Sequence, residues 1–311
     1  MASSAPENGH ATAGLPISVC VPSTRWETVG STIHAVRAQT WTDWELVILG
    51  QGSREPLEAA VAKAAAGDRR VRYVQLRGRG LSLARNAALE VAAGSVIAFT
   101  DDDCEPRPDW LASFAQAFLD DRRLGVVGGA VLSPESLGYL KTCPTCIPSE
   151  GLYDPVAEPG HPPDGWDWIG ANFAVRRDVA RGLGAFDECL GAGSDFPAAE
   201  DTDYKLRLEA AGVRMLSTPR AAVIHTYGVR RGWAVFRSQR NYATGNGGMA
   251  GKLTLLGDMR GEQWLDDTRK DCHGTPPRLA RSLRRLHYFS AAYERCLRDY
   301  NVVDGFLRRA G

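Results

Sequence analysis

The chain has no run of about 18 consecutive apolar residues, the length needed for a helix to cross a bilayer. Residues 1–14 are small and polar, and they lack the basic start and apolar centre of a signal peptide. We therefore expect residues 1–14 to form a disordered tail. We also expect a cytoplasmic location, with peripheral contact with the inner membrane face left open.

The chain also lacks a net charge, because its 37 basic residues balance its 37 acidic ones. A protein that binds duplex nucleic acid usually carries a basic excess, so no nucleic-acid partner is expected. The seven cysteines are odd in number and scattered, which argues against a disulfide framework. Cys143 and Cys146 form one C-x-x-C without a second pair, so we interpret them as loop residues in preference to a zinc or redox site.

The first half of the chain alternates short apolar runs with helical patterns. Apolar runs at residues 17–21, 45–49, 95–100 and 126–132 are typical of buried strands, and residues 71–76 are predicted as a further strand. Helical patterns lie between most of them, which predicts an α/β fold with a mostly parallel sheet covered by helices. In such sheets ligands bind at the carboxyl ends of the strands.

One of these strands runs directly into Asp101, Asp102 and Asp103. Three adjacent carboxylates repel one another unless a cation compensates them. If the strand continues, Asp101 and Asp103 share a face and bracket one Mg²⁺ or Mn²⁺, while Asp102 points elsewhere. A solvated acidic turn, or a cap for the helix that begins near Pro108, explains the triplet equally well by itself.

The acidic triplet is one of seven motifs that follow one another along the chain. They are V-P-S-T-R with Glu27 downstream, A-R-N-A-A-L, T-D-D-D-C, I-G-A-N-F-A-V-R-R, G-A-F-D-E, A-E-D-T-D-Y-K-L-R-L and a final I-H. Together they resemble the family 2 glycosyltransferases of the GT-A fold, from about residue 16 to residue 225. The resemblance implies an enzyme that moves a sugar from a nucleoside-diphosphate sugar to a hydroxyl acceptor, such as a glycan, a lipid-linked sugar or a natural product.

The resemblance also implies a divalent metal, Mn²⁺ or Mg²⁺. The acidic triplet takes the place of the family's D-x-D motif, with Asp101 and Asp103 as metal ligands and Asp102 near the ribose or the metal. His225 matches a histidine that completes the metal site, although a strand-end histidine taken alone is more often structural.

Contacts with the donor are implied for residues in five segments, namely Pro22, Thr24, Glu27, Gln51, Arg85, Asp101, Asp102, Gly170 and Asn172. Gln51 stands where members often carry the aspartate that binds uracil. Its amide donates and accepts hydrogen bonds but carries no charge. The resemblance therefore favours a UDP-sugar while leaving the base open. Taken alone, Arg85 is more often a surface residue.

Glu200 and Asp201 match the pair that supplies the catalytic base. The resemblance favours Asp201 as the base, with Glu200 orienting the acceptor, and it implies inversion in one displacement. An acceptor hydroxyl must lose its proton as it attacks, and a carboxylate within hydrogen-bond reach takes it. An acidic helix N-terminus stabilised by the helix dipole is the plainer interpretation of the pair.

Beyond residue 255 the resemblance fades. We expect one GT-A domain over residues 15–255 and a helical extension over residues 256–311. Residues 233–242 are predicted as a helix, whereas residues 245–248 are interpreted as a loop, with a lid as the alternative. The Arg-rich C-terminal region predicts an amphipathic helix packed on the core or on a second subunit, as in a homodimer. Contact with an anionic membrane stays open.

Two other functions share parts of this pattern. A sugar-1-phosphate nucleotidyltransferase would use a similar fold and metal, but V-P-S-T-R-W-E lacks the glycines of its usual first loop. A non-catalytic nucleotide-sugar-binding protein would not need every acidic position. The motif Q-x-x-R-W of processive members is also missing, so a single transfer per encounter is expected.

Overall fold

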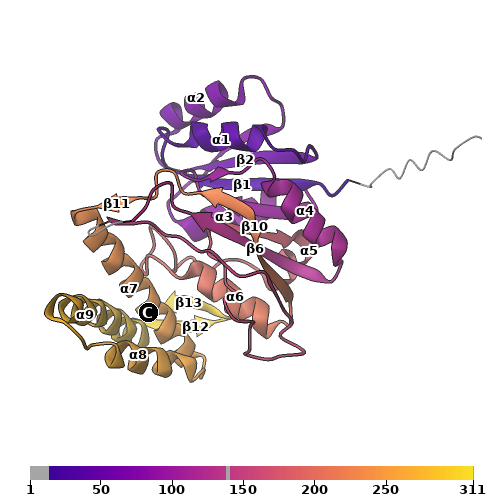
Figure 1. The fold of residues 1–311 in the computed structure, drawn as a ribbon. Helices are drawn as coiled ribbons and strands as arrows, with labels where there is room; N and C mark the ends of the chain where they lie inside the picture. Colours follow the sequence, from indigo (N-terminus) through magenta and orange to yellow (C-terminus); the bar gives the residue numbers. More distant parts are fainter. Residues whose placement is uncertain (1–13, 138–140, 311) are drawn as a thin grey trace, which may run out of the picture.

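The computed structural model describes residues 14–137 and 141–310 (Figure 1). The predicted disordered tail, except for its last residue, lies outside the described residues. The N-terminal half alternates strands and helices as predicted. Its elements are β1 Ile17–Ser23, α1 Val29–Arg37, β2 Trp44–Gly50, α2 Arg54–Ala65, β3 Val71–Gln75, α3 Leu81–Val91, β4 Val96–Thr100, β5 Glu105–Pro106, α4 Trp110–Asp120 and β6 Leu124–Leu132.

The second half begins with a long segment of short strands and then becomes mostly helical. Its elements are β7 Lys141–Thr142, β8 Gly151–Tyr153, β9 Asn172–Arg176, α5 Arg177–Leu183, α6 Glu200–Ala210, β10 Arg214–Ile224, β11 Arg230–Arg231, α7 Trp233–Leu255, α8 Arg260–Lys270, α9 Pro276–Asp299, β12 Tyr300–Val303 and β13 Phe306–Arg309. No helix among the described residues is long and apolar enough to span a membrane.

The central sheet has the order β3-β2-β1-β4-β9-β6-β10-β5, and β8 pairs with β10. Strands β1 to β4 pair in parallel, whereas β9 runs antiparallel between β4 and β6. The sheet is therefore mostly parallel, as predicted. Strand β9 was not predicted as a strand, because its sequence was interpreted only as a pocket motif.

Apolar side chains cover both faces of the sheet. Val19 and Val21 of β1 belong to a cluster with α1, α2 and α4, whereas Cys20 belongs to a second cluster with α3 and α6. Alternate residues of a strand point to opposite faces, so a continuous apolar run fits a strand that is buried on both sides.

Pairing between strands determines which loops meet. β1 and β4 run in parallel, with Cys20 opposite Phe99, so the loop after Ser23 lies beside the turn after Thr100. β10 runs parallel to β6 and pairs with β5, with Ile224 opposite Glu105. This pairing brings residue 225 beside the acidic turn.

The prediction of a glycine-rich loop at residues 245–248 is wrong, because this segment lies inside helix α7. A Cβ on Gly245 would lie 2.5 Å from the Cβ of Ala198, and one on Gly248 would lie 2.2 Å from the ring of Phe196. Gly247 comes equally close to the backbone of Phe289 in α9. These glycines therefore let α7 pack closely on its neighbours, and this gain outweighs their low helix propensity.

Helices α7, α8 and α9 pack together on one side of the molecule, with the β12–β13 hairpin among them (Figure 1). Buried Lys252 of α7 joins this unit to the sheet domain. Its Nζ lies 2.8 Å from Asp187 and 2.5 Å from Asp203 of α6. Asp187 also accepts a hydrogen bond from the backbone N–H of Leu307 in β13. The predicted amphipathic C-terminal helix exists as α9, and it packs on α7. The domain boundary at residue 255 stays a prediction.

Candidate active site

A cavity of about 560 Å³ opens at the carboxyl ends of β1, β4 and β10. The acidic turn after β4 lines it, together with the N-terminus of α6 and His225. The loop at Pro144 and Thr145 and the first two turns of α7 complete the wall. This volume lies within the range of small-molecule sites. The cavity thus unites residues from segments far apart in sequence.

The acidic triplet lies in a turn and not in the strand, since β4 ends at Thr100 and the N–H of Cys104 bonds to the carbonyl of Asp101. The argument from strand alternation was therefore wrong in its premise. Asp102 faces the loop after β1, where it shares the Arg25 guanidinium with Asp103. It accepts hydrogen bonds from the Ser23 hydroxyl at 2.8 Å and from the backbone N–H of Thr24 at 3.2 Å.

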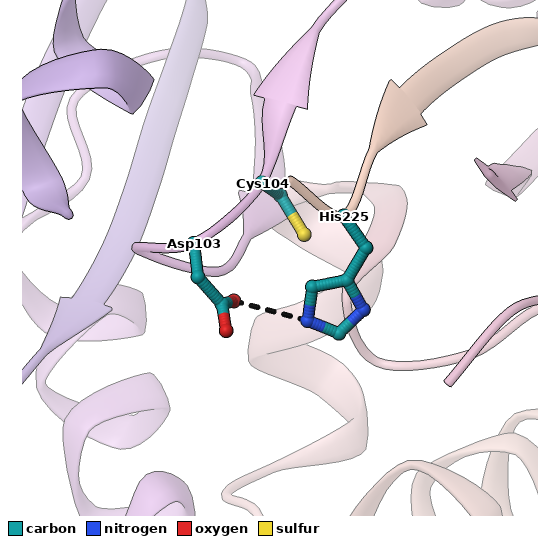
Figure 2. Close-up of side chains that lie close together, drawn as sticks. All are labelled: Asp103, Cys104 and His225. Atoms are coloured by element: carbon teal, nitrogen blue, oxygen red, sulfur yellow. Dashed lines mark ion pairs between the residues drawn. The ribbon is translucent and has the colours of Figure 1, made fainter. Parts of the chain in front are cut away.

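Asp103 and His225 face each other from two different strand ends (Figure 2). Their Oδ1 and Nε2 atoms are 3.1 Å apart, and both side chains are buried. Burial raises the pKa of Asp103, but His225 and Arg25 outweigh it and hold the value at about 2. Burial lowers the pKa of His225, yet the Asp103 carboxylate raises it overall. The pair therefore favours a cation or a proton between its two atoms.

The geometry of this pair fits a hard divalent cation. His225 Nδ1 lies 3.0 Å from the Pro144 carbonyl, which only an N–H can approach, so Nε2 is left to face Asp103. Neighbouring ligand atoms at about 2.1 Å from one octahedral ion are about 3.0 Å apart. The separation of Nε2 and Oδ1 suits that arrangement. Among the described residues, Asp103, Cys104 and His225 each have a potential metal-ligand atom within 4.8 Å of those of the other two.

Cys104 lies in this cluster but suits a hard cation poorly. Burial, followed by the charges of Asp101 and Asp103, raises the pKa of its thiol well above the ordinary value. Mg²⁺ and Mn²⁺ prefer oxygen and imidazole ligands over a neutral thiol. Asp101 lies on the cavity wall, and burial and the Asp103 charge raise its pKa. A positive ion in the cavity would relieve that repulsion, so Asp101 stays a predicted ligand.

Glu200 and Asp201 begin helix α6 at the cavity wall. Ala199, just before them, has φ of +70°, a strained conformation for a residue with a Cβ. The Asp201 carboxylate accepts hydrogen bonds from the N–H groups of Gly170 at 2.7 Å and Thr202 at 2.8 Å. The two donors fix this carboxylate, which is only partly buried, at the cavity.

Glu200 is more deeply buried than Asp201 and pairs with Arg85 at 2.7 Å. Burial and the Asp201 charge raise the pKa of Glu200 to about 7, although Arg85 opposes them. Arg85 also donates to the carbonyl of Gly170 at 2.7 Å. Its guanidinium thus joins α3 to both segments that hold the acidic pair. Arg85 lines the cavity, but the hydrogen bonds of its guanidinium are made to Glu200 and Gly170 of the protein itself.

The structure brings most of the predicted donor contacts to the cavity. Pro22, Thr24, Gln51 and Gly170 all line it. The Gln51 amide is engaged with the backbone of Gly80, donating to its carbonyl at 3.0 Å and accepting from its N–H at 3.3 Å.

Two predicted contacts lie elsewhere. Glu27 is exposed and outside the cavity wall. Asn172 is fully buried in β9 and also outside the wall, where its side chain accepts from the indole of Trp110 and donates to the carbonyls of Ala130 and Ala221. Asn172 therefore joins the strands from behind the cavity, and this structure gives no support for a donor contact by either side chain.

Arg25 is a site residue that the motif contained but the interpretation left without a role. Its guanidinium pairs with Asp102 and lies 2.8 Å from Asp103. The available signal was the positive charge of the arginine in V-P-S-T-R, because the strand before this motif was expected to end at the same edge of the sheet as the acidic triplet. Arg230, Arg237 and Tyr242 were also missed as cavity residues. Residues 233–242 were predicted as a helix, but the glycines beyond them hid the length of α7.

The sheet with its acidic cavity at the strand ends defines a GT-A fold transferase. The family profile described as glycosyl transferase family 2 matches residues 18–182, more than half of the chain. The chain belongs to glycosyl transferase family 2 and is a glycosyltransferase. The alternative interpretations as a nucleotidyltransferase and as a non-catalytic binding protein are therefore set aside.

Curated relatives agree with this membership. The chain is 28% identical over 234 residues to the glucosyl-dolichyl phosphate glucuronosyltransferase of Haloferax volcanii, covering 72% of this chain and 74% of that protein. It is 30% identical over 176 residues to the succinoglycan biosynthesis protein ExoM of Rhizobium meliloti, covering 56% and 53%. The second relative is therefore matched over only about half of its length.

Solved structures share the fold at low identity. One is the mannosyltransferase PcManGT from Pyrobaculum calidifontis in complex with GDP-Man and Mn²⁺, with a TM-score of 0.56 and 18% identity over 92% of this chain and 73% of that chain. Another is S. aureus TarS 1-349 in complex with UDP, with a TM-score of 0.55 and 14% identity over 95% and 96%.

Proposed function

We propose that this glycosyltransferase moves one sugar from a nucleoside-diphosphate sugar, a UDP-sugar in the first instance, to an acceptor hydroxyl with inversion. The observation that carries the proposal is the single cavity that contains both the Asp103–His225 pair and the Asp201 carboxylate. The Asp103–His225 pair suits a metal-bound diphosphate, and the Asp201 carboxylate suits an attacking hydroxyl.

The donor would lie across the loop after β1 and the turn after β4. Pro22, Thr24 and Gln51 line this part of the cavity, and the N–H of Gln51 donates to the carbonyl of Ser23 at 2.9 Å. Asp103 and His225, with Asp101, would hold Mn²⁺ or Mg²⁺ here. When bound, such an ion neutralises charge on the leaving diphosphate. Mn²⁺ in the mannosyltransferase structure supports this assignment by analogy.

The chemical step needs one base and no covalent intermediate. The Asp201 carboxylate takes the proton of the acceptor hydroxyl while that oxygen forms a bond to the anomeric carbon. The bond from the anomeric carbon to the diphosphate oxygen breaks, and the nucleoside diphosphate leaves with that electron pair. Glu200, fixed by Arg85, would position the acceptor beside Asp201.

The acceptor class is proposed more coarsely as a hydroxyl-bearing glycan, lipid-linked sugar or natural product. The relative from Haloferax volcanii has a lipid-linked phosphate in its name, which supports the lipid-linked class. The basic side chains Arg230 and Arg237 on the α7 side of the cavity support an anionic ligand as well.

The test begins with binding. Thermal unfolding is measured with UDP, GDP and dTDP, each with and without Mn²⁺, because a ligand that binds only the folded state raises the melting temperature. We expect Mn²⁺-dependent stabilisation, largest with UDP. No metal-linked stabilisation by any of the three would overturn the proposal.

The second test concerns the base. Asp201→Asn should lower donor hydrolysis and transfer about 10²- to 10⁴-fold while UDP binding persists. Asp164→Asn is the matched control, because Asp164 is exposed and lies outside the cavity wall. Unchanged hydrolysis in Asp201→Asn would remove Asp201 from this role. NMR of the first product formed tests inversion.

A further inference from the structure

A second cavity of about 460 Å³ lies between helices α7, α8 and α9. Its wall carries the aromatic rings of Trp264, Tyr288 and Phe289. The amides of Gln239 and Asn246 add hydrogen-bonding groups. Apolar surface with a few polar groups is the usual composition of a small-molecule site. None of these residues belongs to the motifs of the glycosyltransferase family described above.

The charge of this second cavity is positive. Four arginines line it, namely Arg240, Arg281, Arg284 and Arg285, against the two aspartates Asp267 and Asp271. Two positive charges therefore remain without compensation from the wall itself.

The arginines differ in their partners. Arg285 pairs with Asp271 at 2.6 Å. The Arg240 guanidinium lies over the ring of Tyr288, and that of Arg284 lies over Phe236, which orients both planar groups without neutralising them. Among the described residues Arg281 has no carboxylate within ion-pair distance. Guanidinium groups held in this way bind the oxygens of a phosphate group well.

Helix α7 separates this second cavity from the active site and forms a wall of both. Arg237 and Asn241 face the active site, whereas Gln239 and Arg240 face the second cavity. Tyr242 lines both.

We propose that the second cavity binds a phosphate group of the acceptor, so that the acceptor hydroxyl reaches Asp201 past Tyr242. A phosphate monoester carries up to two negative charges, which match the net charge of two that the lining arginines and aspartates leave. The aromatic wall would pack against the organic part next to the phosphate. This proposal rests on the proposed function, because it assigns the acceptor side of the same active site.

Isothermal titration of the full chain with 1-naphthyl phosphate tests the proposal, with 2-naphthol as the uncharged comparison. We expect binding of the phosphate ester and at least about tenfold weaker binding in the double variant Arg281→Gln, Arg284→Gln. The control Arg278→Gln, Arg122→Gln removes the same charge from exposed positions outside the cavity and should bind as the wild type does. Equal binding of 1-naphthyl phosphate by both double variants would overturn the proposal, and so would a wild type that binds neither this ester nor the vesicles described next.

Two further measurements complete the test. The first distinguishes failure of the proposed function from failure of the second cavity, and the second distinguishes a lipid phosphate from a soluble one. UDP stabilisation with Mn²⁺, measured on the same variants, reports the donor site alone, so its loss in every protein would count against the proposed function and not against this cavity. Vesicles containing phosphatidic acid test a lipid source: binding that the Arg281, Arg284 variant loses assigns a lipid phosphate. Soluble binding without vesicle binding assigns a soluble one. Vesicle binding that both double variants retain, without soluble binding, would show general surface attraction and refute the site.

Discussion

Replacing Glu200 by Gln is expected to remove a pH-dependent loss of stability from the metal-free protein. Burial and the neighbouring Asp201 raise the pKa of Glu200 from 4.5 to about 7, against the opposing charge of Arg85. In the unfolded chain the ordinary value returns. The folded state therefore keeps a proton on Glu200 over a pH range in which the unfolded state has lost it.

The sign and the magnitude follow from this difference. Below pH 4.5 both states hold the proton, and the stabilisation relative to neutral pH is complete. As the pH rises to about 7, it is lost at about 1.4 kcal/mol per pH unit, which amounts to about 3 kcal/mol in all. Gln cannot ionise, so the Glu200→Gln variant should not show this part of the decline.

Urea unfolding in EDTA at intervals from pH 4.5 to 8 measures the effect. The difference in unfolding free energy between Glu200→Gln and the wild type should grow in favour of the variant by about 3 kcal/mol and then level off above pH 7. The attraction between Arg85 and ionised Glu200 is already contained in the pKa of about 7, so it adds no further change to this difference. Glu158→Gln, at an exposed position, should follow the wild-type profile. A difference that stays constant across this range would refute the reasoning.

Three other predictions concern the packing and the charges around the site. Lys252→Met should destabilise the protein by about 3 to 5 kcal/mol in urea unfolding, because it leaves two buried carboxylates without their shared cation; a loss below about 1 kcal/mol would contradict this. Arg25→Ala should tighten Mn²⁺ binding up to about tenfold by calorimetry, since the guanidinium competes with the ion for the acidic turn; weaker binding would show that Arg25 supports the metal site. Gly248→Ala should cost about 1 to 3 kcal/mol through overlap with Phe196, whereas Gly182→Ala, with open space around it, should be neutral or slightly stabilising; equal effects on the melting temperature would rule out the packing argument.

Much of the fold could be predicted because local patterns and tertiary packing agree in the first half of the chain. Strands β1, β2 and β4 are short apolar runs, helices lie between the strands, and the observed bounds of β1 to β4 differ from the predicted ones by at most two residues. The residues that follow β1 and β4 could be placed together for the same reason, since parallel strands bring their carboxyl ends to one edge, whereas His225 was placed beside them only by the family resemblance.

Long-range packing explains what could not be predicted. In α7 the glycines 245, 247 and 248 argue against a helix locally, and only their contacts with Ala198, Phe289 and Phe196 show why they are there. Asn172 stands in a pocket motif, yet its amide bonds to carbonyls from β6 and β10, which no spacing reveals. The second cavity depends on three helices whose relative placement the sequence does not specify.

The hydrogen bond from Leu307 to Asp187 has a consequence for how the molecule is completed during synthesis. The first five strands in chain order can pair long before residue 307 exists, but the segment that leads into α6 gains one of its donors only from the final hairpin. In a nascent chain the sheet can therefore be complete while the segment before α6 still lacks the hydrogen bond from Leu307. A peptide fused directly after β13 would lie close to the hydrogen bond between Leu307 and Asp187.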